Sequence, residues 1–207
     1  MASLLLRSYY IRFHQESLWI LEQFLISVNA IRKNPPSEKH SRLAAEMGVV
    51  RLHDAWARFS RNLVIVSAGG RPYTENGLRL RTAPGVKRIQ DVIPTLLSSY
   101  KKRTLEPPWA IPKESIDAAQ RLAIHNFTTF SAAIGSTPSP AEEMRPLRNF
   151  VAHRGKGTAN AVRQQGFFFY GDRVSIEAVA GDFVQPGITR FEHWVAGMQI
   201  IARAAIQ

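Results

Sequence analysis

One segment, Arg145 to Arg154, combines residue types that could together do chemistry on a phosphodiester. It reads Arg-Pro-Leu-Arg-Asn-Phe-Val-Ala-His-Arg and places Arg148, Asn149 and His153 within about two turns of a predicted helix. In RNA cleavage, a basic group takes the proton of the ribose 2′-hydroxyl while a fixed positive charge stabilises the charge that grows on the phosphate. His153 and Arg148 have the chemistry for these two tasks.

The helical spacing gives Asn149 a role beside this pair. Asn149 and His153 are four residues apart and share a helix face, and the long side chain of Arg148 can curl onto that face. Asn149 can therefore hold the imidazole by a hydrogen bond and fix which ring nitrogen is offered to a substrate. Phe150 and Val151, between them, are predicted to face the core.

The spacing of Arg148 and His153 is not specific by itself. In a chain with 20 Arg and 6 His, an Arg followed by four to six residues and a His is expected about once or twice by chance, and Arg7 with His14 is such a pair. The setting distinguishes the second occurrence. Its helix has a capping signature, in which Ser139 precedes a proline and Glu142 follows, and Gly155 is placed to end it.

The rest of the chain predicts further helices that would position this segment. Apolar residues recur at helical spacing in most of the chain, and Gly and Pro interrupt the pattern. Pro146 predicts a kink or a new start within the motif helix. The other predicted helices cover about residues 3–32, 37–68, 86–100 with a bend at Pro94, 113–134, and 189–205 with a Thr189 to Glu192 capping box.

This pattern predicts an all-α fold, an up-and-down bundle of about five main helices in a single domain over residues 1–207. Alternation of Val174, Ile176 and Ala178 leaves room for a short β-hairpin near 167–178. The aromatic run 167–170 could stack on bases or belong to the core. Residues 155–158, Gly-Lys-Gly-Thr, are interpreted as a helix stop followed by a mobile basic loop.

Composition narrows the classes of partner and site. The 207 residues carry a formal net charge of +11, and 20 of the 27 basic residues are Arg. Such a charge favours an anionic partner, and the planar guanidinium suits phosphate and bases, although a high-GC genome enriches Arg as well. The chain has no Cys, which excludes disulfides and Cys-based zinc sites. The His residues show no metal-ligand spacing, so neither a metal nor a cofactor is predicted.

No membrane span or signal peptide is predicted. The apolar N-terminal stretch is interrupted by Arg7, Arg12, His14, Glu16 and Glu22. We therefore expect a soluble cytoplasmic protein.

The residues from Leu147 to Arg154 resemble the signature of the HEPN superfamily, the helical "higher eukaryotes and prokaryotes nucleotide-binding" domains. Members with an Arg, a polar residue, further positions and a His are typically metal-independent endoribonucleases of toxin–antitoxin, abortive-infection and other phage-defence systems. The close match covers about ten residues, and the rest of the chain matches only as helices in a plausible order.

The resemblance implies a fold, an activity and partners. The family's helical bundle dimerises so that motifs from two chains meet in one cleft, which implies a homodimer with a composite active site. Arg148 and His153 become the catalytic pair, and Asn149 the polar position between them. RNA is the implied substrate, and a cognate antitoxin or sensor protein is the expected restraint on a toxic nuclease.

Further residues are expected near this site. Many such domains place a polar or acidic residue of an earlier helix beside the motif, and His53 and Asp54 are the candidates. An ordinary ion pair of Asp54 with Arg58, four residues on, is the competing interpretation. We expect RNA-backbone contacts from basic residues flanking the two segments: Arg51, Arg58, Arg145, Arg154 and Lys156.

Two other functions are consistent with the sequence. In one, the helical scaffold is a non-catalytic module that binds RNA, a nucleotide or a partner protein, and Arg148 contributes affinity without turnover. In the other, the motif is a hydrogen-bond cluster at a dimer interface. The effects of Arg148→Ala on affinity and on oligomeric state would distinguish them.

Overall fold

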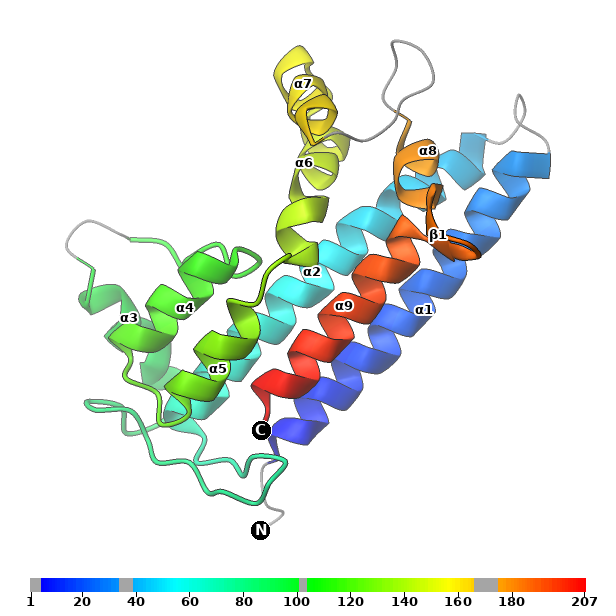
Figure 1. The fold of residues 1–207 in the computed structure, drawn as a ribbon. Helices are drawn as coiled ribbons and strands as arrows, with labels where there is room; N and C mark the ends of the chain where they lie inside the picture. The colour runs from blue at the N-terminus through cyan, green and yellow to red at the C-terminus, as the bar shows by residue number, and fades with distance from the viewer. Residues whose placement is uncertain (1–4, 34–38, 101–103, 166–174) are drawn as a thin grey trace. The chain divides into compact units, whose positions relative to one another are not determined.

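The computed structural model describes residues 5–33, 39–100, 104–165 and 175–207, and it is helical with one small hairpin (Figure 1). The prediction of an all-α fold with a short β-hairpin is confirmed. The described α-helices are α1 (Leu6–Lys33), α2 (Lys39–Gly69), α3 (Val92–Ser98), α4 (Pro112–Arg121), α5 (Phe127–Ile134), α6 (Pro140–His153), α7 (Lys156–Gln164), α8 (Ile176–Gly181) and α9 (Arg190–Ala205).

The helix expected over residues 113–134 is two helices in the structure. α4 ends before Ala123, whose φ of 50° lies in the left-handed region, and α5 starts at Phe127. Leu122 and Ile124, on either side of Ala123, are buried. Burial of both side chains accompanies this break in a segment that was predicted as one continuous helix.

The segment after Gly155 also differs from the prediction. The motif helix ends at His153, two residues before Gly155, and Gly155 is the N-cap of α7 instead of opening a loop. Its amide donates to Thr158 Oγ1 at 3.0 Å, and the same hydroxyl donates to the Gly155 carbonyl at 2.9 Å. The prediction of a mobile loop at residues 155–158 is therefore wrong, because Lys156 begins a helix and Thr158 supplies the hydrogen-bond partner at its N-cap.

The hairpin lies later in the chain than predicted. Residues 176–181 form α8, capped by Ser175 Oγ, which accepts from the Ala178 amide at 3.3 Å. The antiparallel strands are β1 (Phe183–Gln185) and β2 (Ile188–Thr189), joined through Gly187 at φ 79°. The aromatic run 167–170 and the rest of 166–174 lie outside the described residues.

The chain forms two compact units. Unit 1 comprises residues 5–14, 56–139 and 199–207, and its core includes an aromatic cluster. Within this cluster the rings of Phe13 and Phe59 lie 5.1 Å apart, and both contact Trp56. A bidentate ion pair joins Arg61 of α2 to Glu106, which lies before α4 in the same unit.

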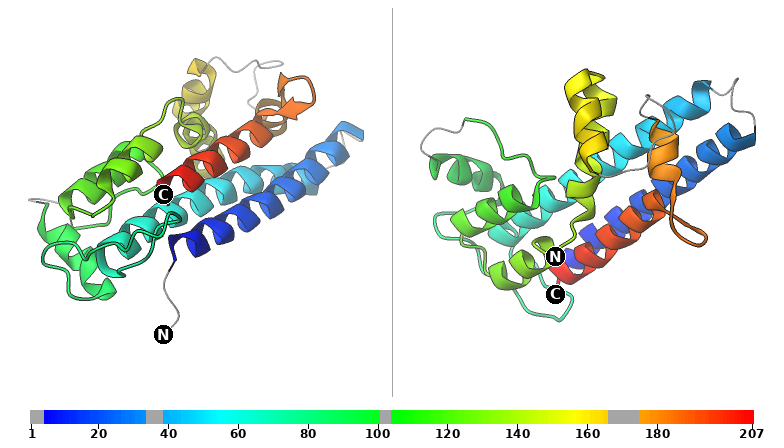
Figure 2. Two further views of the ribbon diagram at one scale, coloured as in Figure 1. Left: turned by 60° about the horizontal axis from the view of Figure 1, so that its bottom comes forward. Right: turned by 45° about the horizontal axis from the view of Figure 1, so that its top comes forward.

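Unit 2, residues 15–55 and 140–198, contains the motif segment. Here α9 lies alongside α1 in each view (Figure 2), and the stacked rings of Phe24 and Phe191, with centroids 4.0 Å apart, join the two helices. The predicted capping box begins α9: Thr189 N–H donates to Glu192 at 2.7 Å, and the Glu192 amide donates to the Thr189 hydroxyl at 3.2 Å. Unit 2 thus has its own packed core.

The start of α6 is fixed within unit 2 by two contacts with α9. A Cβ on Gly197 would lie 2.7 Å from Pro140 Cγ, so the glycine allows the first turn of α6 to approach closely. Arg190 Nη1 also donates to Glu143 Oε1 at 3.1 Å. The helix that carries the motif is therefore anchored at its N-terminal end.

None of the helices in the described part of the chain is long and apolar enough to cross a membrane.

Candidate active site

Helix α6, which carries the motif, is buried mainly in its N-terminal half. Its residues Met144 and Leu147 are fully buried, whereas Arg148 and Asn149 are half-buried and His153, the last residue of the helix, is exposed. Burial therefore decreases along the helix from its N-terminal to its C-terminal end. Phe150 and Val151, predicted to face the core, are half-buried.

The central contact of the site joins α6 to α2. Arg148 Nη2 lies 3.8 Å from Asp54 Oδ1, with 29% of the Arg side chain and 45% of the Asp side chain exposed. The structure thus brings the motif arginine next to the acidic candidate from the earlier helix. The guanidinium keeps exposed surface, while its Nε is buried and makes no hydrogen bond to a described residue.

His53 completes this cluster from the inner side. Its Nδ1 lies 3.8 Å from Asp54 Oδ1, beyond hydrogen-bond distance, and 12% of the side chain is exposed. Both ring nitrogens are buried without a hydrogen-bond partner among the described residues. Burial lowers the pKa of His53, the charge of Arg148 lowers it further, and Asp54 opposes them. Folding therefore favours the neutral form of His53.

The two histidines of the site differ in what they can reach. His53 has both ring nitrogens covered by protein, so a substrate cannot approach them in this conformation. His153 is exposed at the end of α6, five residues after Arg148. Of the two, His153 is the side chain that can exchange a proton with a ligand. Its connection to Arg148 is the backbone of α6 itself.

The residues predicted to contact RNA lie in different settings. Arg145 is exposed one turn before Arg148, and Lys156 is exposed at the start of α7. Arg154 forms an ion pair with Glu46, which offsets part of its charge. The guanidinium of Arg51 lies over the ring of Trp19 in α1. Arg58 is exposed on the part of α2 that belongs to unit 1.

Glu46 is a residue of the site that was not predicted. It lies seven residues before His53, two helical turns on the same face of α2, and its pairing with Arg154 is a second link between α2 and the motif segment. The spacing of Glu46 and His53, seven residues apart on one face of α2, was the available signal.

Among the described residues, no group of three or more His, Cys, Asp or Glu side chains is placed to hold a metal ion. The chain was also compared with known protein families, with curated protein sequences and with solved structures. None of these comparisons gives a significant match.

The lowered pKa of His53 predicts a pH-dependent stability. An unfolded His titrates near pH 6.5, so below this pH the unfolded chain binds a proton before the native chain does. The stability that neutral His53 contributes is then fully present above about pH 6.5. As the pH falls below this value, the free energy of unfolding decreases by at most about 1.4 kcal/mol per pH unit, until the pH reaches the lower native pKa. Urea unfolding of the wild type and of His53→Gln across this range measures the effect.

The expected outcome is a flatter pH profile in His53→Gln than in the wild type. The control is His193→Gln, which makes the same substitution at an exposed histidine of α9. Identical profiles for the wild type and His53→Gln would contradict the buried, neutral state of His53.

Proposed function

We propose that this chain is a metal-independent endoribonuclease of the HEPN type, acting as a toxin or effector in a toxin–antitoxin or phage-defence system. One observation carries the proposal. The arginine of the Arg-x4-His segment is partly exposed and paired with Asp54 of a second helix, 3.8 Å away, while the histidine of the same segment is exposed. An anchored cation and an accessible proton-transfer group are the two components that 2′-hydroxyl attack requires.

The proposed reaction conserves atoms and charge without an added reagent. The ribose O2′ forms a bond to the adjacent phosphorus as its proton passes to an imidazole, and the bond from phosphorus to O5′ breaks as O5′ gains a proton. The products are a 2′,3′-cyclic phosphate and a 5′-hydroxyl. His153 and its mate in a homodimer supply the two proton-transfer groups, one as base and one as acid.

The other residues support this step. Arg148 stabilises the added negative charge of the phosphorane, and Asp54 is a positioning residue that limits where the guanidinium points. Asn149 orients the imidazole or donates to a phosphate oxygen. Arg145 and Lys156, both exposed, fit contacts to the flanking phosphates. A cognate antitoxin or sensor protein is the proposed partner that keeps such an activity in check.

The test is RNA cleavage in excess chelator. Purified protein is incubated with a 5′-labelled single-stranded RNA and EDTA, and the product ends are identified by their sensitivity to acid and to phosphatase. We expect 2′,3′-cyclic phosphate and 5′-hydroxyl ends. The control for contaminating ribonuclease is the Arg148→Ala/His153→Ala protein, purified in parallel.

One observation favours a second function, a non-catalytic RNA-binding module. Asp54 already offsets part of the charge of Arg148, as an ion pair that only organises the helix would do. This function predicts salt-sensitive RNA binding with no product in the cleavage assay. Binding without cleavage by the wild-type chain, at protein in excess over RNA, would replace the nuclease proposal with the module.

A further inference from the structure

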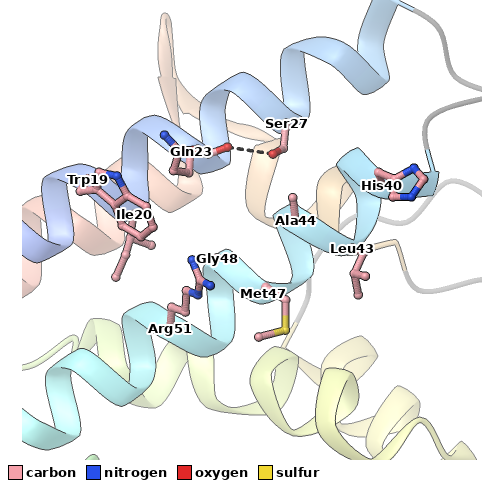
Figure 3. Close-up of a pocket in the computed structure, with 10 residues that line it drawn as sticks. All are labelled: Trp19, Ile20, Gln23, Ser27, His40, Leu43, Ala44, Met47, Gly48 and Arg51. Carbon is pink, nitrogen blue, oxygen red and sulfur yellow. Dashed lines mark hydrogen bonds between the residues drawn. The ribbon is translucent and has the colours of Figure 1, made fainter.

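A pocket of about 370 Å³ opens between the parts of α1 and α2 that belong to unit 2 (Figure 3). Its volume is in the range of small-ligand sites, about 300–1,000 Å³. Trp19 and Gln23 contribute from α1, and Leu43, Met47 and Arg51 from α2. None of these residues belongs to the Arg148 and Asp54 cluster.

Trp19 is the residue that sets this pocket apart. Half of its surface is exposed, whereas Trp56, Trp109 and Trp194, the other tryptophans of the chain, are at most 7% exposed. The guanidinium carbon of Arg51 lies 5.5 Å from the centroid of the Trp19 ring, and Figure 3 shows the Arg51 side chain extending from α2 toward α1. The guanidinium thus lies over the indole, yet half of the Trp19 surface is still exposed. An exposed aromatic ring together with an arginine is the arrangement on which nucleobases stack in single-strand binding proteins.

The remaining lining suits the other parts of a base. Leu43 and Met47 are 57% and 39% exposed and contribute apolar surface to the lining from α2. The Gln23 side-chain amide offers a donor and an acceptor, as a base edge requires. The Ser27 hydroxyl donates to the backbone carbonyl of Gln23 at 2.8 Å, so its oxygen remains able to accept.

Charge selects an anionic occupant. Among the described residues that line the pocket, the ionisable side chains are His40 and Arg51, and no carboxylate is present. The whole chain carries +11. A nucleotide matches all of these features at once, with an aromatic face for Trp19, hydrogen-bonding edges for Gln23 and a phosphate for Arg51. An apolar protein segment would use the aliphatic surface but not the arginine.

The pocket and the candidate active site share helix α2. Arg51 and Asp54 are three residues apart on α2 and are therefore neighbours on its surface, and Met47 and Asp54 are seven apart on one face. A strand whose phosphate meets Arg51 is thus within one helical turn of Asp54, the partner of Arg148.

We propose that the Trp19 pocket binds one nucleobase of single-stranded RNA, stacked on the indole with the adjoining phosphate on Arg51. The choice of RNA rests on the proposed function. Binding of a base in the pocket does not depend on RNA cleavage, so the test uses a variant that is not expected to cleave RNA.

The experiment uses the emission of Trp19, since the other tryptophans are buried. Full-length His153→Ala protein is titrated with a ten-nucleotide oligoadenylate RNA at about 0.15 M salt, where weak phosphate contacts are reduced. We expect quenching of the exposed-indole emission on binding, and its loss in a Trp19→Leu background. Anisotropy of a labelled oligonucleotide should show affinity about 5-fold or more weaker for Trp19→Leu, because base stacking is lost.

Two variants make the affinity change specific. Trp19→Phe keeps an aromatic face and should retain affinity within about 3-fold of the parent. Ile26→Ala removes another exposed apolar side chain of α1, 57% exposed and outside the pocket lining, and should leave affinity unchanged.

Unchanged RNA affinity in Trp19→Leu, or a titration without quenching, would overturn the proposal. If Trp19→Leu instead changes only the molar mass in light scattering, the surface is a protein contact and the nucleobase assignment is wrong. The two proposals can fail separately. If RNA binding depends on Trp19 but the wild type does not cleave RNA, only the nuclease proposal is wrong. If the wild type cleaves RNA but binding does not depend on Trp19, only the nucleobase proposal is wrong.

Discussion

An Arg148→Ala protein is expected to cleave RNA about 100- to 1,000-fold more slowly than the wild type at saturating RNA, because loss of one fixed donor to a developing anion typically costs this much. The structure makes Arg148 suited to this task. Its guanidinium is partly exposed, and pairing with Asp54 at 3.8 Å restricts its position before substrate arrives. Single-turnover cleavage with protein in excess measures the chemical step separately from binding.

The matched control is Arg145→Ala. Arg145 is on the same helix, one turn earlier and exposed, so its loss should weaken binding in a salt-dependent way and leave the single-turnover rate at saturation within about 3-fold. Arg148→Lys tests geometry, since an ammonium keeps the charge but not the planar fork, and it should recover only part of the rate. An Arg148→Ala protein that loses affinity while keeping its saturated rate would contradict the role in charge stabilisation.

The fold was predictable where local signals agree with packing. Apolar periodicity with a clear stop gave α1 and α2 to within a few residues, and the Thr189 to Glu192 pair, which forms both capping hydrogen bonds, gave the start of α9. The errors arise where tertiary contacts decide. No composition rule places a positive φ at Ala123, where buried neighbours on both sides accompany the break between α4 and α5.

The candidate site was predictable in its residues more than in its contacts. Residue type and spacing selected Arg148 and His153 and pointed to His53 and Asp54, but the distance from Asp54 to Arg148 depends on how α2 packs against α6. The burial of both His53 nitrogens likewise follows from that packing, and so does the pairing of Glu46 with Arg154. The Trp19 pocket was missed because Trp19 and Arg51 are 32 positions apart and meet only across two helices.

His153→Ala is expected to lower the cleavage rate by about 100- to 10,000-fold, the range that a positioned proton-transfer group contributes. The fold should tolerate the change, since His153 is exposed at the last position of α6 and the buried residues that anchor this helix, Met144 and Leu147, are untouched. The measurement is cleavage in excess chelator, together with a thermal unfolding midpoint to show that the loss of rate is chemical.

The control for this variant is His193→Ala, which removes another exposed histidine of unit 2 and should keep the wild-type rate. If His153 and Arg148 act on one transition state, Arg148→Ala/His153→Ala should be little slower than the worse single variant, because groups that act as a unit are not additive. Cleavage by His153→Ala within about 3-fold of the wild type would end the assignment. The buried ring nitrogens of His53 offer no accessible substitute, so such a result would also exclude the proposed chemistry at this cluster.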